Sequence, residues 1–109
     1  MILAVIFDLD GTLVETEELK ALSYARAARE LRPTLRVYER LLADHDLIVS
    51  HRYPHNIALL HEVRRLGYPT ALSTMSHPGQ VRHVLSILGL GKEFDVVATR
   101  AGCRRRCGV

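Results

Sequence analysis

Two carboxylates separated by a single residue follow an apolar run near the start of the chain. Asp8 and Asp10 come directly after MILAVIF, and Gly11 follows them. Residues at i and i+2 of an extended segment lie on the same side, so both carboxylates are expected to face one crevice. Their mutual repulsion would be relieved by a divalent cation, and oxygen ligands of this kind suit Mg²⁺. Asp8 and Asp10 are therefore the candidate metal ligands.

The same two carboxylates are suited to phosphoryl transfer. One carboxylate can attack phosphorus, while its neighbour, when protonated, donates a proton to the leaving oxygen. Gly11 would let backbone amides approach a phosphate, and Thr12 and Thr74 offer hydroxyl donors. The structural alternative is an acidic turn after a strand for the carboxylates and an ordinary strand-end hydroxyl for Thr74.

Three apolar segments are expected to form the strands that position these residues. They are apolar on both faces, as buried parallel strands are, and cover residues 2–8, 69–75 and 94–99. Because reactive groups gather at the carboxyl ends of parallel strands, Asp8, Asp10 and Thr74 should meet at one edge of the sheet. The order strand, helices, strand, helix, strand predicts an α/β fold with right-handed crossovers.

Four helices are predicted between these strands from the spacing of apolar residues and from capping residues. The predicted apolar faces are Leu22, Ala25, Ala28 and Leu31 in a helix over 16–31; Leu35, Tyr38, Leu41 and Leu42 in one starting at Thr34; Leu59, Val63 and Leu66 after a loop at 50–56; and Val81, Val84, Leu85 and Leu88 in a helix ending at Gly89. Ser76 is placed to cap the last of these helices and also counts as a candidate phosphate-binding residue.

Length and composition limit the classes of protein to which the chain can belong. The 109 residues suffice for one small domain, and 48% are apolar, which favours a globular fold over disorder. No apolar run approaches the length of a membrane span, and MILAVIF is too short for a signal peptide, so a cytoplasmic location is expected. The net charge of +3 comes from the tail, which contains Arg100, Arg104, Arg105 and Arg106. Nucleic-acid binding is therefore not expected, and residues 100–109 are predicted to be disordered.

Cysteine and histidine patterns do not favour a metal site. Cys103 and Cys107 lack the spacing of a zinc knuckle and have no second ligand pair. The histidines at 45, 51 and 55 have gaps of six and four residues that cross a probable loop, and no cysteine joins them. His77 is close to Thr74 and is the one histidine that could touch a phosphate, although a helix-terminal role is the simpler interpretation.

Two stretches carry a family resemblance. AVIFDLDGTLVETE resembles the first motif of the haloacid dehalogenase (HAD) superfamily, most closely that of the phosphoglycolate phosphatase and β-phosphoglucomutase group. GYPTALSTMSHPGQVRHVLSILGLGKEFDVV resembles the second motif and the segment that follows it. The resemblance implies an HAD-type Rossmann-like parallel sheet and an enzyme that hydrolyses small phosphate esters with Mg²⁺.

The resemblance also implies a role for each motif residue. Asp8 would be the nucleophile that forms an aspartyl-phosphate, and Asp10 would be the general acid and base. Asp8 would give a carboxylate oxygen to Mg²⁺, and Asp10 its backbone carbonyl. Thr12 would position Asp10 or the substrate, and Thr74 would bind the transferring phosphoryl group.

The chain departs from the family pattern in two respects. Residues 16–49 suffice only for a reduced helical cap, inserted into a core formed by 1–15 and 50–99. The family's later lysine and acidic motifs do not follow the third strand, so the sheet is expected to be incomplete, with about three strands and with 2–8 at its edge. The Arg-, Gly- and Cys-rich tail suggests a chain truncated or frameshifted after residue 99. The alternative function is thus an inactive remnant that binds partners or forms a homodimer through that edge.

Overall fold

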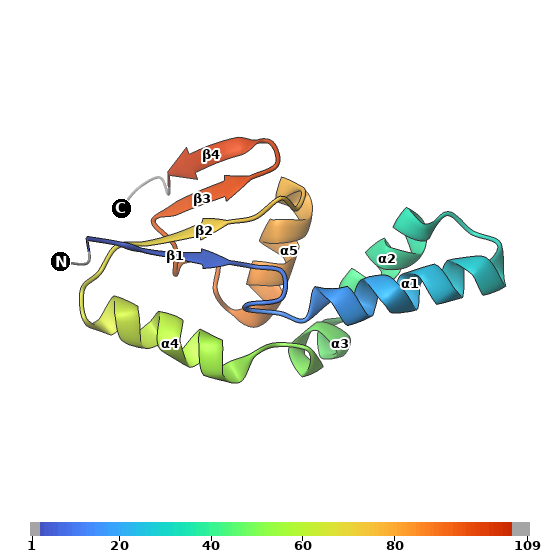
Figure 1. Ribbon diagram of the computed structural model, residues 1–109, viewed down its shortest axis with the longest axis horizontal. Coiled ribbons are helices and arrows are strands. Elements are labelled where there is room, and N and C mark those ends of the chain that lie inside the picture. Colours follow the sequence, from blue (N-terminus) through green and yellow to red (C-terminus); the bar gives the residue numbers. More distant parts are fainter. Residues whose placement is uncertain (1–2, 106–109) are drawn as a thin grey trace.

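A computed structural model describes residues 3–105 of the chain (Figure 1). Its elements are, in order, β1 (Val5–Asp8), α1 (Thr16–Glu30), α2 (Thr34–Leu42), α3 (His45–Ser50), α4 (Pro54–Arg65), β2 (Thr70–Ser73), α5 (Pro78–Leu88), β3 (Val96–Thr99) and β4 (Gly102–Arg105). The predicted α/β class is confirmed, and the three predicted strands correspond to β1, β2 and β3.

The sheet has the strand order β1-β2-β3-β4. The first three strands are parallel, and the register places Asp8 beside Ser73 and Ser73 beside Ala98. The crossovers are helical: the segment α1 to α4 joins β1 to β2, and α5 joins β2 to β3. This arrangement brings the segments that follow β1, β2 and β3 to one edge of the sheet (Figure 1).

The fourth strand corrects two predictions. β4 pairs antiparallel with β3, with Val97 beside Arg104 and Thr99 beside Gly102. The hairpin is possible because Gly102 adopts a φ of 127°, a backbone conformation that side-chain-bearing residues rarely adopt. The sheet therefore has four strands in place of about three, and the prediction of a disordered tail is wrong for residues 100–105. Residues 106–109, which include Arg106 and Cys107, lie outside the described part of the chain.

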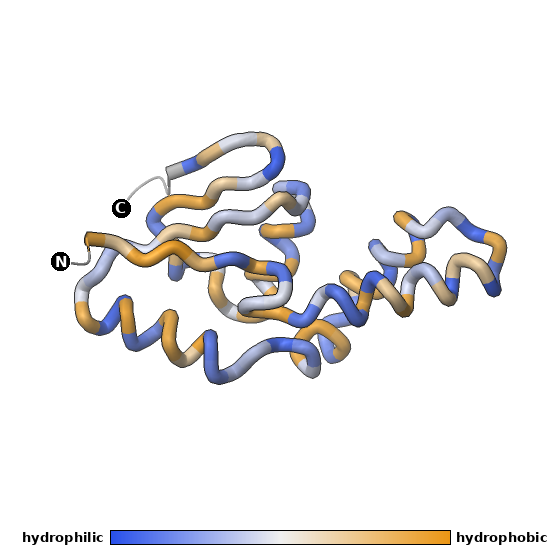
Figure 2. The backbone as a smooth tube through the Cα atoms, viewed as in Figure 1, coloured by the Kyte–Doolittle hydropathy of each residue, from blue (hydrophilic) through white to orange (hydrophobic). Residues whose placement is uncertain are grey.

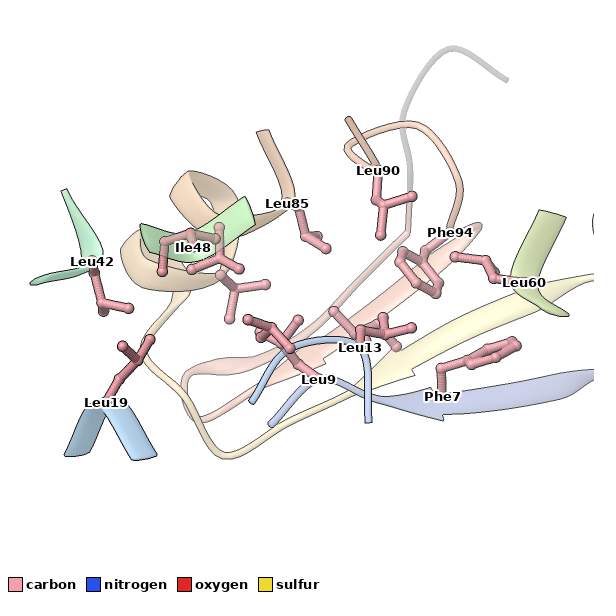
Figure 3. Close-up of a cluster of buried hydrophobic side chains, with 14 residues drawn as sticks. Phe7, Leu9, Leu13, Leu19, Leu42, Ile48, Leu60, Leu85, Leu90 and Phe94 are labelled. Carbon is pink, nitrogen blue, oxygen red and sulfur yellow. The ribbon is translucent and has the colours of Figure 1, made fainter. Parts of the chain in front are cut away.

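The hydrophobic core lies on one face of the sheet. Phe7 of β1 and Leu72 of β2 pack with residues of α4 and α5 into one buried cluster (Figure 3). Within it, the rings of Phe7 and Phe94 meet edge to face, with centroids 6.3 Å apart. The opposite face of β1 is open, and Ile6 is 71% exposed. Figure 2 shows that most of β1 is apolar, although it lies at the sheet edge, and that the strand becomes hydrophilic at its carboxyl end.

Helices α1 and α2 form a hairpin that projects away from the sheet (Figure 1). Two segments of the chain, at residues 13–15 and 51–53, connect the helical insertion to the core. Two backbone hydrogen bonds join these segments to each other: Glu15 N–H donates to the His51 carbonyl (2.8 Å), and Tyr53 N–H donates to the Leu13 carbonyl (2.9 Å). The Tyr53 hydroxyl also donates to the carboxylate of Glu15, and this bond lowers the pKa of Glu15 and raises that of Tyr53. The assignment of residues 16–49, which contain this hairpin, to a reduced cap stays a prediction.

Several predicted helix faces and boundaries are wrong. In α1 the buried residues are Thr16, Leu19, Ser23 and Ala27, and in α4 the buried residue is Leu60. Leu31, Leu35, Leu59 and Leu66 of the predicted faces are exposed. The predicted loop at 50–56 is shorter, because α3 extends to Ser50 and α4 begins at Pro54. The face of α1 was mispredicted from its apolar spacing because α1 contacts mainly α2, not the sheet. The face predicted for α5 is confirmed at Val81, Val84 and Leu85.

No helix among residues 3–105 is both long and apolar enough to cross a membrane.

Candidate functional site

Asp10 lies at the centre of a cluster of hydroxyl groups. Its Oδ1 accepts a hydrogen bond from Thr16 (2.8 Å), and its Oδ2 accepts bonds from Thr74 (3.1 Å) and Ser76 (2.8 Å). Thr16 and Thr74 are 2% and 6% exposed, so the bonds that these two residues donate are partly shielded from water. Hydrogen bonds to an ionised acceptor are stronger than neutral ones, and three of them fix the orientation of the carboxylate.

The sheet explains why these residues meet. Asp10 follows β1 and Thr74 follows β2, and these two strands are adjacent and parallel. Thr74 N–H donates to the Ala98 carbonyl of β3 (2.9 Å), and Ser76 N–H donates to the Thr74 hydroxyl (3.1 Å). The predicted meeting of Asp10 with Thr74 is thus present. Ser76 does not cap α5, because that cap is His77, whose Nδ1 accepts from the Gly79 N–H (3.2 Å).

Gly11 and Thr12 form the turn that follows Asp10. Gly11 has a φ of 76°, and its N–H donates to the Val14 carbonyl (2.8 Å). A residue with a side chain would be strained at that φ, so the turn requires glycine. The Thr12 carbonyl accepts from the side-chain amide of Asn56 (2.7 Å), which ties the turn to α4. Asn56 was not identified from the sequence, because nothing in the local pattern of α4 marks it.

Asp8 lies outside the hydroxyl cluster. Its side chain is exposed, and its Oδ1 accepts from the N–H of Leu9 (2.8 Å). Within the described residues no hydroxyl donates to Asp8, and it does not line the cavity above Asp10. The two carboxylates are therefore near each other in sequence but differ in environment: Asp10 is held by three donors, and Asp8 is accessible to a ligand.

A cavity of about 730 Å³ opens above Asp10. Its walls come from the core and from the projecting hairpin, and include Asp10, Lys20, Tyr38, Ser76, His77 and Arg100. Sequence reasoning missed Thr16, Lys20, Tyr38 and Arg100. The rule that selected Thr74, that residues after a parallel strand lie at the reactive edge, would also have selected Arg100. A second cavity of about 770 Å³, between α5 and the β3–β4 hairpin, contains none of the predicted site residues.

Tyr38 is a sensitive probe of this cavity. Burial, followed by the negative charges of Asp10 and Glu17, raises the pKa of Tyr38 to about 12. Because the pKa of Tyr38 in the folded chain lies above its unfolded value, which is near 10, the protonated Tyr38 side chain contributes to the stability of the fold. That contribution is complete below about pH 10 and is lost as the pH rises through about 12. The pKa of Tyr53 is also raised, by its hydrogen bond to Glu15, so we expect Tyr38→Phe to lose part, not all, of the late-titrating phenolate absorbance of the native chain. A Tyr38→Phe titration identical in shape to that of the native chain would contradict this placement.

Metal-binding residues are few. Within residues 3–105 no group of three or more His, Cys, Asp or Glu side chains is arranged to hold a metal ion. His51 pairs instead with Glu18 (3.5 Å), and Cys103 is exposed. Mg²⁺ commonly binds through one or two carboxylates, with water and substrate phosphate completing the shell, so Asp8 and Asp10 are chemically suited to it.

The chain matches no family model and no curated protein. It is similar in structure to an HAD phosphatase from Thermococcus onnurineus, with 27% identity and a TM-score of 0.58 over 91% of this chain and 62% of that one. It is also similar to β-phosphoglucomutase from Clostridium difficile (20% identity, TM-score 0.64, 97% of this chain and 65% of that one). A third similar structure is CbbY from Rhodobacter sphaeroides in complex with phosphate (23% identity, TM-score 0.61, 91% and 64%).

The chain therefore spans somewhat less than two thirds of the length of these structures. The chain thus has the haloacid dehalogenase-like fold, and the resemblance carried by its two sequence motifs is confirmed.

Proposed function

We propose that the chain is a phosphohydrolase of the HAD type, which acts on small phosphate esters with Asp8 as the nucleophile. The observation that carries the proposal is the hydroxyl cluster, in which Thr16, Thr74 and Ser76 hold the carboxylate of Asp10 at the carboxyl ends of β1 and β2. The CbbY structure, which has this fold, contains bound phosphate. A small phosphorylated metabolite is accordingly the proposed substrate class.

The proposed reaction has two steps. In the first, a carboxylate oxygen of Asp8 forms a bond to phosphorus while the ester P–O bond breaks, and protonated Asp10 gives its proton to the leaving alcohol oxygen. In the second, water attacks the phosphorus of the aspartyl-phosphate, and Asp10 takes a proton from that water. Inorganic phosphate leaves, and the Asp8 carboxylate is restored.

The surroundings of the two aspartates suit these different roles. A nucleophile must reach the substrate, and Asp8 is exposed. An acid and base must keep its orientation, and three hydroxyl groups hold Asp10. Mg²⁺, when bound by Asp8 and Asp10, would neutralise charge on the phosphoryl oxygens.

The test is hydrolysis of p-nitrophenyl phosphate by the purified full chain, with Mg²⁺ and with EDTA. We expect turnover that depends on Mg²⁺ and is inhibited by inorganic phosphate. A folded chain with no turnover toward this or a panel of sugar and carboxylic-acid phosphates would contradict the proposal.

A second candidate function is self-association through the β1 edge. Within the described sheet β1 pairs only with β2, and Leu3 and Ile6 are 75% and 71% exposed. An exposed apolar edge strand is a template for pairing with another chain. We expect a dimer whose fraction rises with concentration in sedimentation experiments and falls in Ile6→Lys. Leu31→Lys, at an exposed position in the projecting hairpin, is the matched control. A monomer at all concentrations would exclude this function.

A further inference from the structure

The cavity above Asp10 is rich in negative charge for a site that would receive a phosphate. Asp10 and Glu39 both line it, whereas Asp8 lies outside it. A phosphate monoester adds up to two further negative charges near neutral pH. Binding it beside these carboxylates requires opposing positive charge, because like charges at short range repel strongly.

Two permanent cations line the same cavity, and they come from different parts of the fold. Among the described residues of its wall, Lys20 belongs to α1 and Arg100 follows β3 directly. His77 also lines the cavity, and its Nδ1 already accepts the N–H of Gly79. Lys20 and Arg100 are therefore the side chains that can supply fixed positive charge there.

The backbone of Arg100 is held beside the hydroxyl cluster. Its N–H donates to the carbonyl of Ser76 (3.3 Å), and the hydroxyl of Ser76 donates to Asp10. Within the described residues no carboxylate forms an ion pair with the Arg100 guanidinium. A guanidinium placed in this way can bind two phosphate oxygens at once.

Lys20 is available to an anion for a different reason. Its ammonium group lies 3.4 Å from Glu17, one turn earlier on α1, and the two side chains are 39% and 73% exposed. Solvent-exposed pairs of this kind are weak. A phosphate dianion in the cavity would attract the Lys20 ammonium group more strongly than the single charge of Glu17 does. Lys20 can therefore leave Glu17 and pair with the phosphate.

We infer that Arg100 and Lys20 together bind the phosphoryl group of the substrate, Arg100 from the sheet edge and Lys20 from the projecting hairpin. The inference rests on the proposed function and deepens it, because it names the residues that offset the charge of the phosphate. It also gives the hairpin a role in binding, since α1 contributes one of the two cations. Substrates that carry a dianionic phosphate are then preferred over carboxylate or sulfate analogues of the same size.

The test measures binding of inorganic phosphate to the full chain by calorimetry, so that it does not depend on turnover. We expect the dissociation constant to rise at least about tenfold in Arg100→Gln and in Lys20→Gln. Arg100→Lys, which keeps the charge but loses the planar fork, is expected to retain part of the affinity. Arg82→Gln, an exposed cation of α5 that lines the other cavity, is the matched control and should bind as the native chain does. Thermal melting of each variant verifies that it is folded.

The inference is overturned if the folded native chain does not bind phosphate, or if Arg100→Gln and Lys20→Gln bind it as Arg82→Gln does. Its failure can be told apart from that of the proposed function. A chain that binds phosphate through Arg100 and Lys20 but never turns over contradicts the hydrolase proposal alone. An active chain whose phosphate affinity is the same in every variant contradicts this inference alone.

Discussion

Asp8→Asn is expected to abolish Mg²⁺-dependent hydrolysis of p-nitrophenyl phosphate, with kcat falling by at least about 10³-fold. The amide is nearly isosteric with the carboxylate but is a poor nucleophile, and it removes the negative charge that would help to hold Mg²⁺. The exposed side chain of Asp8 accepts only the Leu9 N–H among the described residues, so the substitution should leave stability almost unchanged. Steady-state kinetics and thermal melting of the same preparation test both statements.

Two further variants decide how the Asp8 result is interpreted. Asp10→Asn should also lose most activity, because an amide cannot donate or accept the proton, and it should change stability more, because three hydroxyl groups bind Asp10. Asp46→Asn, in an exposed position on α3, is the matched control and should keep full activity. Activity retained in Asp8→Asn would place the nucleophile elsewhere.

Phe7→Ala is expected to lower the free energy of unfolding by about 3–5 kcal/mol. The Phe7 side chain is 6% exposed and packs edge to face on Phe94, so its removal leaves a cavity between β1 and the helices of the core. Domains of this size have total stabilities of about 5–15 kcal/mol, so the loss is a large fraction of the whole. Urea denaturation followed by circular dichroism measures the change.

Ile6→Ala is the matched control for this experiment. Ile6 precedes Phe7 on β1 but lies on the open face and is 71% exposed, so its truncation should change stability by no more than about 0.5 kcal/mol. Similar losses in the two variants would mean that both faces of β1 are covered, for example by a second copy of the chain. A loss of stability that varies with protein concentration in Ile6→Ala, but not in Phe7→Ala, would lead to the same conclusion.

The elements near the site were predictable because their signals are local. The apolar runs around Phe7, Leu72 and Val97 are each bounded by polar or turn residues, and the structure places β1, β2 and β3 within them. The crossover rules for parallel strands then predict that Asp10 and Thr74 meet, and a hydrogen bond of 3.1 Å joins them. The α5 face followed from its spacing because that face lies in the same buried cluster as Phe7 and Leu72 of the sheet.

Other features depend on partners that are distant in sequence. The face of α1 was mispredicted because its neighbour is α2, so Ser23 and Ala27 are buried while Leu31 is 92% exposed. β4 was missed because its residues have no strand periodicity. It forms by pairing with the free edge of β3 after a turn that Gly102 permits.

The sequence by itself determined the α/β fold, the strand that carries Asp8, and the position of Thr74 directly after the next strand, because each follows from residue types and short spacings. Only the tertiary structure decided how the two aspartates differ and which cations face the cavity. Asp10 receives hydrogen bonds from Thr16, Thr74 and Ser76, whereas Asp8 is exposed. Lys20 and Arg100 come together from positions 80 residues apart in the chain. The physical reason is that hydrogen bonds and charge interactions act over a few ångströms. Whether two remote residues come within this range is set by the packing of the fold, not by their spacing along the chain.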